Sequence, residues 1–276
     1  MAIIEVEKLW HVYSGDICAL REVDLKIEEG SVVAIIGQNG SGKTTLVKHF
    51  NGLLRPTKGK VLVNSEDIST KTVSQLSRTV GYVFQNPNHQ LFCTSVEAEV
   101  QFGPKNLDLT EKEVQSRVTE ALEFFGISKY REEHPYSLSL GLRKLVAVAS
   151  VYAMHPHVIV LDEPTTGLDH IGVDRISKTV KQMNKEGHTI IIITHHMPFV
   201  AENAERVVVM AKGEIIADDS PRKVFTTMHD VLEKTNLSPP QITELANRLS
   251  DFKFPKEILT PGEMSNALVW RLEHNG

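Results

Sequence analysis

Short apolar runs rich in β-branched residues recur along the chain and alternate with segments of helical spacing. Runs typical of strands occupy residues 23–27, 31–36, 60–63, 80–84, 157–161, 189–194, 206–210 and 214–217. Several are apolar at every position, like strands buried in a parallel sheet, whereas the early and late runs resemble antiparallel hairpins. The pattern predicts an α/β fold with a mainly parallel sheet and an antiparallel β subdomain near the N-terminus.

A helical segment interrupts the strand pattern between residues 88 and 156. Thr110 and Glu113 fit a capping box, apolar residues then recur at helical spacing, and Gly126 stands where that helix is expected to end. We interpret residues 88–156 as a helical subdomain inserted into a domain that spans residues 1–220.

The segment after residue 220 has helical spacing as well. Ser238 is the expected N-cap of a helix over residues 242–249, with prolines in its first turn. We interpret residues 221–276 as a separate, small C-terminal helical extension.

A glycine-rich loop follows the apolar run at residues 31–36. It reads GQNGSGKT and fits the pattern G-x-x-x-x-G-K-[ST], with helical residues directly behind it. Its backbone N–H groups suit phosphate oxygens, Lys43 can reach the β- and γ-phosphates, and Thr44 can ligate Mg²⁺. A turn that merely joins a strand to a helix would leave the lysine and the hydroxyl unexplained. The predicted ATP or GTP site comprises Gly37, Asn39, Gly40, Ser41, Gly42, Lys43, Thr44 and Thr45.

Two acidic residues end the apolar run at residues 157–161. Beside a phosphate loop, Asp162 is placed to hold Mg²⁺, and Glu163, on the opposite side of the pleat, is placed to polarise the water that attacks the γ-phosphate. The alternative is a strand that simply ends in two solvated acids.

Two further polar residues end strands that should reach the same sheet edge. His195 follows the run at residues 189–194 and can contact the γ-phosphate, although a histidine at a strand end is more often a surface residue. Gln85 follows the run at residues 80–84, and its amide can reach Mg²⁺ and the attacking water. We predict catalytic roles for Glu163, His195 and Gln85, and a magnesium site made by Thr44, Gln85 and Asp162.

Composition narrows the class of protein. Thirty basic and 35 acidic residues give a net charge of −5 without a long run of either sign, so we expect no nucleic-acid partner. No apolar run approaches the ~20 residues that cross a bilayer. The two cysteines, Cys18 and Cys93, are expected to be buried small hydrophobic residues in a reducing compartment. The 12 histidines are scattered without ligand spacing, which argues against a metal-handling protein.

Taken together, the motifs resemble the ABC ATPase family. They occur in that family's order: the loop at residues 37–44, Gln85, LSLG at 138–141, DEPT at 162–165, GLD at 167–169 and His195. The resemblance implies a subunit that dimerises head to tail and sandwiches two ATP molecules between the phosphate loop of one chain and the signature loop of the other. It implies an adenine-stacking role for Tyr13, a signature in trans made by Ser139 and Gly141, and an interface role for Asp169.

A narrower resemblance is to the energy-coupling factor branch, the ATPases of vitamin and cobalt or nickel importers. It is carried by VFQNPNHQLF at residues 83–92, FGP at 102–104 and PPQITELA at 239–246. It implies a peripheral ATPase at the cytoplasmic face of the membrane, with an integral membrane scaffold protein, a separate substrate-binding membrane protein and a second ATPase subunit. The segment after Gln85 is expected to receive the scaffold's coupling helices, and the C-terminal helices are expected to support dimerisation.

The signature departs from the family's Leu-Ser-Gly-Gly-Gln, because leucines stand at positions 140 and 142. The Leu140 side chain either crowds the backbone's approach to the opposing phosphate or points away at little cost. We favour a heterodimer with a paralogue, which keeps one fully equipped site, over a homodimer. The alternatives to an ATPase of an energy-coupling factor importer are the ATPase of an ordinary ABC importer or exporter, a soluble ABC ATPase and a small-molecule kinase.

Overall fold

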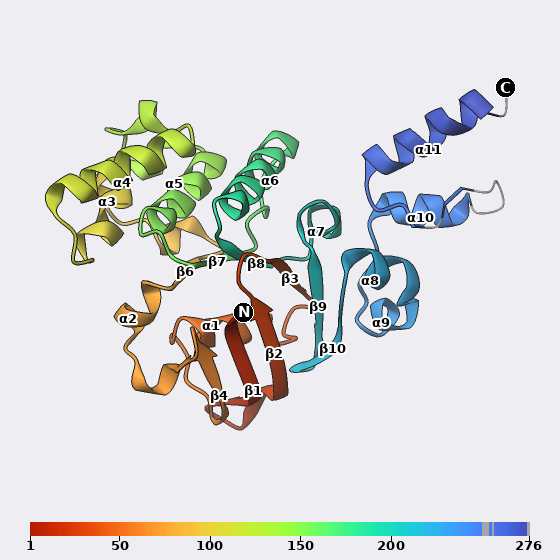
Figure 1. The fold of residues 1–276 in the computed structure, drawn as a ribbon, viewed down its shortest axis with the longest axis horizontal. Coiled ribbons are helices and arrows are strands. Elements are labelled where there is room, and N and C mark those ends of the chain that lie inside the picture. Colours follow the sequence, from red (N-terminus) through yellow and green to blue (C-terminus); the bar gives the residue numbers. More distant parts are fainter. Residues whose placement is uncertain (250–253, 256, 275–276) are drawn as a thin grey trace.

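A six-stranded sheet forms the centre of the molecule (Figure 1), in a computed structural model that describes residues 1–249, 254–255 and 257–274. The strand order is β10-β9-β3-β8-β7-β6, and every neighbouring pair is parallel except β9 and β10. The strands are β3 (Val32–Ile36), β6 (Val80–Val83), β7 (Val158–Asp162), β8 (Thr189–Ile193), β9 (Arg206–Ala211) and β10 (Glu214–Asp219). The mainly parallel sheet and the late antiparallel hairpin are confirmed.

A four-stranded antiparallel sheet packs beneath it in the order β2-β1-β4-β5. Its strands are β1 (Ala2–Tyr13), β2 (Ile17–Glu28), β4 (Lys58–Val63) and β5 (Glu66–Asp67). The sequence pattern did not predict β1. Register shifts and a left-handed φ of 45° at Lys8 disturb the alternation of apolar and polar residues that marks a strand.

Helix α1 (Lys43–Phe50) connects the two sheets. Its Leu46, Val47 and Phe50 are fully buried, in one core cluster with Ile4 of β1 and Ile35 of β3. The helix that begins at the glycine-rich loop is therefore held on both sides by rigid strands.

Helices α3 (Val96–Lys105), α4 (Glu111–Phe124) and α5 (Leu140–Tyr152) lie together beside the edge strand β6 (Figure 1). The capping box of Thr110 and Glu113 is confirmed, and Gly126 follows the end of α4 with a φ of 60°. The other helices before residue 220 are α2 (Val73–Ser77), α6 (His170–Lys185) and α7 (Met197–Asn203), with short 3-10 turns at Ile68–Thr70, Pro87–His89, Ser128–Tyr130 and Pro135–Ser137.

The C-terminal segment lies at the opposite end of the central sheet (Figure 1). It contains α8 (Pro221–Thr227), α9 (His229–Lys234), α10 (Gln241–Arg248) and α11 (Pro261–His274). The prediction that Ser238 caps α10 was wrong. Pro240 takes the N-cap position with a ψ of 140°, so the helix begins at Gln241 and Ser238 lies too early to cap it.

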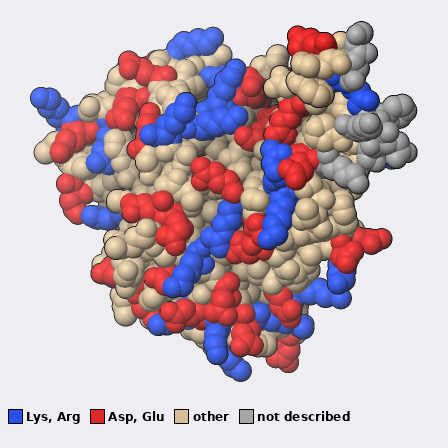
Figure 2. Space-filling model, turned by 45° about the vertical axis from the view of Figure 1, so that its right-hand side comes forward, with Lys and Arg blue, Asp and Glu red and all other residues tan. Residues whose placement is uncertain are grey.

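Cys18 and Cys93 are both free and half-buried, so the expectation of full burial was wrong. Within the described part of the chain, no helix combines the length and apolar character that a membrane span requires. Lys and Arg side chains are interspersed with Asp and Glu over the face drawn in Figure 2.

Candidate functional site

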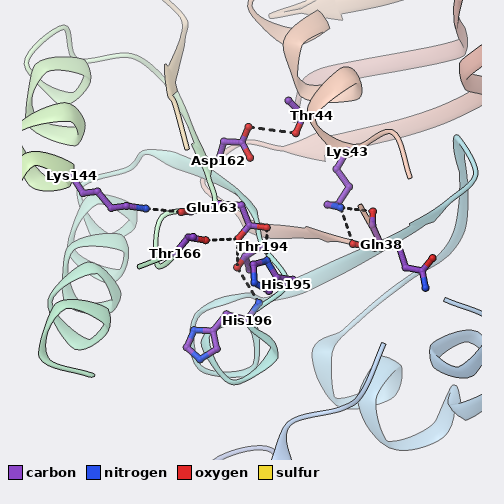
Figure 3. Close-up of polar contacts among 11 residues, drawn as sticks. Gln38, Lys43, Thr44, Lys144, Asp162, Glu163, Thr166, Thr194, His195 and His196 are labelled. Carbon is purple, nitrogen blue, oxygen red and sulfur yellow. Dashed lines mark hydrogen bonds and ion pairs between the residues drawn. The ribbon is translucent and has the colours of Figure 1, made fainter. Parts of the chain in front are cut away.

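The glycine-rich loop joins β3 to α1 at the carboxyl edge of the central sheet. Gly37 has a φ of 152°, and a Cβ there would lie 2.3 Å from the Met210 carbonyl oxygen and 2.7 Å from Ser41 Oγ, so only glycine fits. Lys43 is the first residue of α1, and its Nζ donates to the carbonyls of Gly37 and Gln38 at 2.7 and 2.8 Å (Figure 3). Burial lowers the pKa of Lys43. The loop thus curls around an ammonium group.

A cavity of 360 Å³ opens in front of this loop. Most of the predicted site residues line it: Tyr13, Asn39, Gly40, Gly42, Lys43, Thr44, Thr45, Gln85, Asp162 and Glu163. The sequence pattern did not indicate the remaining lining residues, Ile17, Cys18, Ala19 and Ile193. Gly37, Ser41 and His195 are not among the residues that line the cavity. The cavity therefore joins the end of β1, the loop and the ends of β6 and β7 in one place.

Tyr13 stands at one end of the cavity. The residue is 39% exposed, and its hydroxyl lies 3.2 Å from Thr45 Oγ1 on α1. The His11 ring meets it edge to face at 4.5 Å between centroids. This arrangement leaves one face of an aromatic ring available for stacking at the mouth of the cavity.

Two buried histidines support this end of the cavity. His49 Nδ1 donates to the Thr45 carbonyl at 2.8 Å, and its Nε2 accepts from His11 Nδ1 at 3.1 Å. The same His11 nitrogen lies 3.1 Å from the Arg55 carbonyl. If His49 were protonated, its Nε2–H would point at the N–H of His11 Nδ1. Burial lowers the pKa of His49 from 6.5 to about 4, which keeps the ring neutral.

We expect this neutral histidine to make the protein less stable in acid. In the unfolded chain His49 binds a proton below about pH 6.5, whereas in the folded chain it does so only near pH 4, so stability falls as pH drops through that window. The expected loss between pH 7 and pH 5 is about 2 kcal/mol. The free energy of unfolding of H49Q, measured with urea, should lack this contribution to the pH dependence. H89Q, which changes an exposed histidine, is the control and should keep the pH dependence of the wild type. If stability falls with pH as steeply in H49Q as in the wild type, the prediction is contradicted.

Asp162 ends β7 on the inner wall of the cavity. Its carboxylate accepts from the Tyr82 hydroxyl at 2.6 Å. It also accepts from Thr44 Oγ1 at 3.4 Å (Figure 3). Burial raises the pKa of Asp162, and these donors oppose that shift. Tyr82 was not predicted as a site residue; only the parallel pairing of β6 with β7 brings it beside Asp162.

Glu163 leaves the strand by a sharp change of backbone direction. Its φ is 47°, so the expectation that pleat alternation aims its side chain was wrong. Oε1 accepts from His195 Nδ1 at 2.8 Å, and Oε2 accepts from Thr166 and Thr194 hydroxyls at 3.2 Å each (Figure 3). The carboxylate is thereby held between the ends of β7 and β8.

The oxygen ligands offered around Asp162 suit a magnesium ion. Thr44 offers a hydroxyl, Asp162 a carboxylate and Gln85 an exposed amide on the same cavity, and hard divalent cations prefer oxygen ligands. These three residues would hold the ion.

Ser139, Gly141 and Asp169 do not line the cavity. Ser139 and Asp169 are exposed N-caps: Ser139 Oγ accepts from Leu142 N on α5, and Asp169 Oδ1 accepts from Gly172 N on α6. These residues therefore cannot contact the site of their own chain in this conformation.

The Leu140 side chain points toward its own chain. Its Cδ2 lies so near Gly167 that a Cβ added at Gly167 would be 2.9 Å away. The side chain packs on the segment that carries Asp169 in its own chain. Both alternatives for the effect of Leu140 on an opposing phosphate stay predictions.

Comparisons with known proteins agree with this geometry. A family model described as ABC transporter matches residues 20–166. The energy-coupling factor transporter ATP-binding protein EcfA of Methanoculleus marisnigri is 44% identical over 252 residues, which cover 91% of each chain. The structure of cbiO1 from Clostridium perfringens, described as part of the ABC transporter complex cbiONQ, is 41% identical with a TM-score of 0.77 and covers 88% of this chain and 98% of that one.

Another relative is longer. The putative ABC transporter ATP-binding protein TTE1589 of Caldanaerobacter subterraneus subsp. tengcongensis is 47% identical over 247 residues, or 90% of this chain, which spans 43% of that protein. The shared region contains the loop, the strand ends and the signature described above. The chain belongs to the ABC transporter family, and it is an ATPase of the energy-coupling factor type.

Proposed function

We propose that this chain hydrolyses ATP to ADP and phosphate at the cytoplasmic face of the membrane, as the peripheral ATPase of an energy-coupling factor importer. The observation that carries the proposal is that the phosphate loop, Asp162 and Glu163 line one and the same cavity. The family membership supports the reaction, and the relatives, which are ATP-binding proteins of transporters, support the link to transport.

Phosphoryl transfer depends mainly on positioning and charge stabilisation. The loop N–H groups and Lys43 bind the phosphates, and Tyr13 stacks on the adenine. A bound Mg²⁺ would neutralise phosphate charge. Glu163 takes the proton of the attacking water, while its hydrogen bond with His195 holds the carboxylate in place. Gln85, which lines the same cavity, helps to orient the water.

The exposed signature residues suit a head-to-tail dimer. Ser139, Gly141 and Asp169 lie away from their own cavity, so they are available to complete the cavity of a second ABC ATPase subunit, either a paralogue or a second copy. Helix α11, whose Leu268, Val269, Trp270 and Leu272 are exposed, is a further surface for dimerisation. Closure on ATP and opening after hydrolysis then move the membrane partner.

An exposed aromatic pair suits the membrane scaffold protein. Phe92 and Phe102 are 64% and 50% exposed and meet edge to face at 4.8 Å. They adjoin the segment after Gln85, and the Tyr136 hydroxyl donates to the carbonyls of Asn88 and Leu91 in that segment. We assign this surface to the scaffold's coupling helices.

Phe92→Glu is expected to remove the membrane partners from the chain, because it places a charge in an apolar contact. The measurement is purification of the tagged chain from its own cells in mild detergent, followed by mass identification of co-eluting proteins. Wild type should retain an integral membrane scaffold, a small substrate-binding membrane protein and a second ATPase. The identity of the small protein distinguishes vitamin from cobalt or nickel uptake.

Val73→Glu is the matched control, because Val73 is an exposed apolar residue on α2. It should retain all partners. If the wild-type chain elutes without membrane proteins, the proposed role in an importer is contradicted. If both variants lose their partners, the assignment of Phe92 and Phe102 to a docking surface is contradicted. Partners of another ABC transporter class would support the alternative of an ordinary importer or exporter, and a single ATPase species would show a homodimer.

A further inference from the structure

Lys144 is a buried cation outside the predicted site. It lies on α5, is 6% exposed, and donates from Nζ to the backbone carbonyl of Glu163 at 2.8 Å (Figure 3). In the described part of the chain, no ion pair joins it to a carboxylate. An ammonium group buried to this extent is costly unless it is well coordinated. Its contact with one backbone oxygen therefore calls for an explanation.

The carbonyl that Lys144 contacts belongs to a strained residue. Glu163 has a φ of 47° although it is not glycine, and Pro164 follows it, which favours extended backbone at the preceding position. Such a conformation persists only where neighbours hold it. Glu163 N donates to the Ile193 carbonyl at 2.8 Å, and the Glu163 carbonyl accepts from Lys144 and, at 3.3 Å, from Thr166 N.

The direction of the Glu163 carboxylate depends on this conformation. With the backbone in place, Oε1 meets His195 and Oε2 meets the Thr166 and Thr194 hydroxyls. Rotation of the peptide toward extended backbone would swing the carboxylate away from these partners and from the cavity. Burial lowers the pKa of Lys144 to about 8, and the negative charges of Glu163 and Asp162 oppose that shift.

The start of α5 meets the same segment at a second point. Leu140 packs on Gly167, four residues beyond Glu163, and a Cβ at Gly141 would lie 3.7 Å from Leu168 Cδ2. The helix that presents Ser139 at the surface is therefore fixed to the segment that carries this chain's own Glu163.

We propose that Lys144 is a positioning residue for Glu163, whose ammonium holds the strained carbonyl and so aims the carboxylate at His195 and the cavity. The inference rests on the proposed function, because Glu163 needs aiming only if it activates water. It also connects the signature helix, which faces the partner's site, with the catalytic carboxylate of its own site.

The test compares Lys144→Met, which keeps the length and removes the donor, with Lys144→Arg, which keeps a cationic donor. Turnover of MgATP is measured on the assembly that co-purifies with the tagged chain, and backbone hydrogen exchange is measured on the purified full chain. We expect Lys144→Met to lower kcat at least about 10-fold, with KM within about twofold, because small misplacement of a reacting group is costly. Exchange should become faster in peptides covering residues 162–169, and Lys144→Arg should restore much of both.

Lys178→Met is the control, because Lys178 is an exposed lysine on α6. Its kcat, KM and hydrogen exchange should equal those of the wild type. Unchanged exchange at residues 162–169 in Lys144→Met overturns the proposal, whether or not kcat falls. Faster exchange throughout the chain, with KM raised in parallel and no rescue by arginine, also overturns it, because that marks a general packing role. A wild-type assembly without ATP hydrolysis would instead refute the proposed function, while the exchange data still decide whether Lys144 holds Glu163.

Discussion

Glu163→Gln is expected to lower ATP turnover by about 10³-fold while nucleotide binding stays within about twofold of wild type. A glutamine keeps the size of the side chain and can still contact His195 and the two threonine hydroxyls, but it cannot take a proton from water. General-base catalysis typically contributes 10²- to 10⁴-fold, or roughly 3 to 5 kcal/mol of barrier. Steady-state phosphate release and binding of a fluorescent ATP analogue measure the two quantities separately.

The same variant should accumulate as an ATP-loaded, closed dimer, because binding closes the subunits and hydrolysis no longer opens them. Size-exclusion chromatography with light scattering, in the presence and absence of MgATP, detects this shift. Glu202→Gln, on α7, is the matched control and should retain wild-type turnover. Turnover of Glu163→Gln close to wild type would remove Glu163 from the general-base role.

Lys43→Ala is expected to weaken ATP binding by about 100-fold or more. In the structure the Lys43 ammonium lies within the loop, 2.7 and 2.8 Å from two loop carbonyls, where it can exchange these contacts for phosphate oxygens. Hydrogen bonds that involve a charged group contribute about 1.5 to 3 kcal/mol each, so the loss of this cation corresponds to roughly two decades in Kd. Titration with a fluorescent ATP analogue is the measurement.

Lys60→Ala removes a cation that pairs with Glu7 on the surface of the antiparallel sheet, and it should bind ATP like wild type. Thermal unfolding without nucleotide separates a local effect on binding from a loss of fold. Equal affinity in Lys43→Ala and wild type would contradict the role of the loop as a phosphate site.

Local chemistry explains why much of the fold and cavity could be predicted from the sequence. The run GQNGSGKT carries its own backbone geometry, so Lys43 and Thr44 could be placed between a strand and a helix before any packing was known. The structure shows that α1 already begins at Lys43. Residues that end parallel strands meet at one sheet edge, which is why Gln85, Asp162 and Glu163 reach the same cavity. Among the strands of the described residues, the pattern missed β1, where bulges disturb the alternation, and the very short β5.

The partners within the site could not be predicted in the same way. Tyr82 and Asp162 are 80 residues apart, and Lys144 and Glu163 are 19 apart, so their contacts depend on how β6 and α5 pack against β7. The direction of Leu140 is likewise decided by contact with Gly167 and not by the signature pattern.

The phosphate loop, the parallel sheet and the polar residues at its edge follow from the order of amino acids alone, because each rests on periodicity or on a local backbone requirement. Three features became visible only in the folded chain: the groups that hold the Glu163 carboxylate, the support of Tyr13 by the His11 and His49 pair, and the position of Ser139 and Asp169 outside their own cavity. These features arise from side-chain contacts between segments distant in the chain, and the distances between such segments are set by the packing of the whole core.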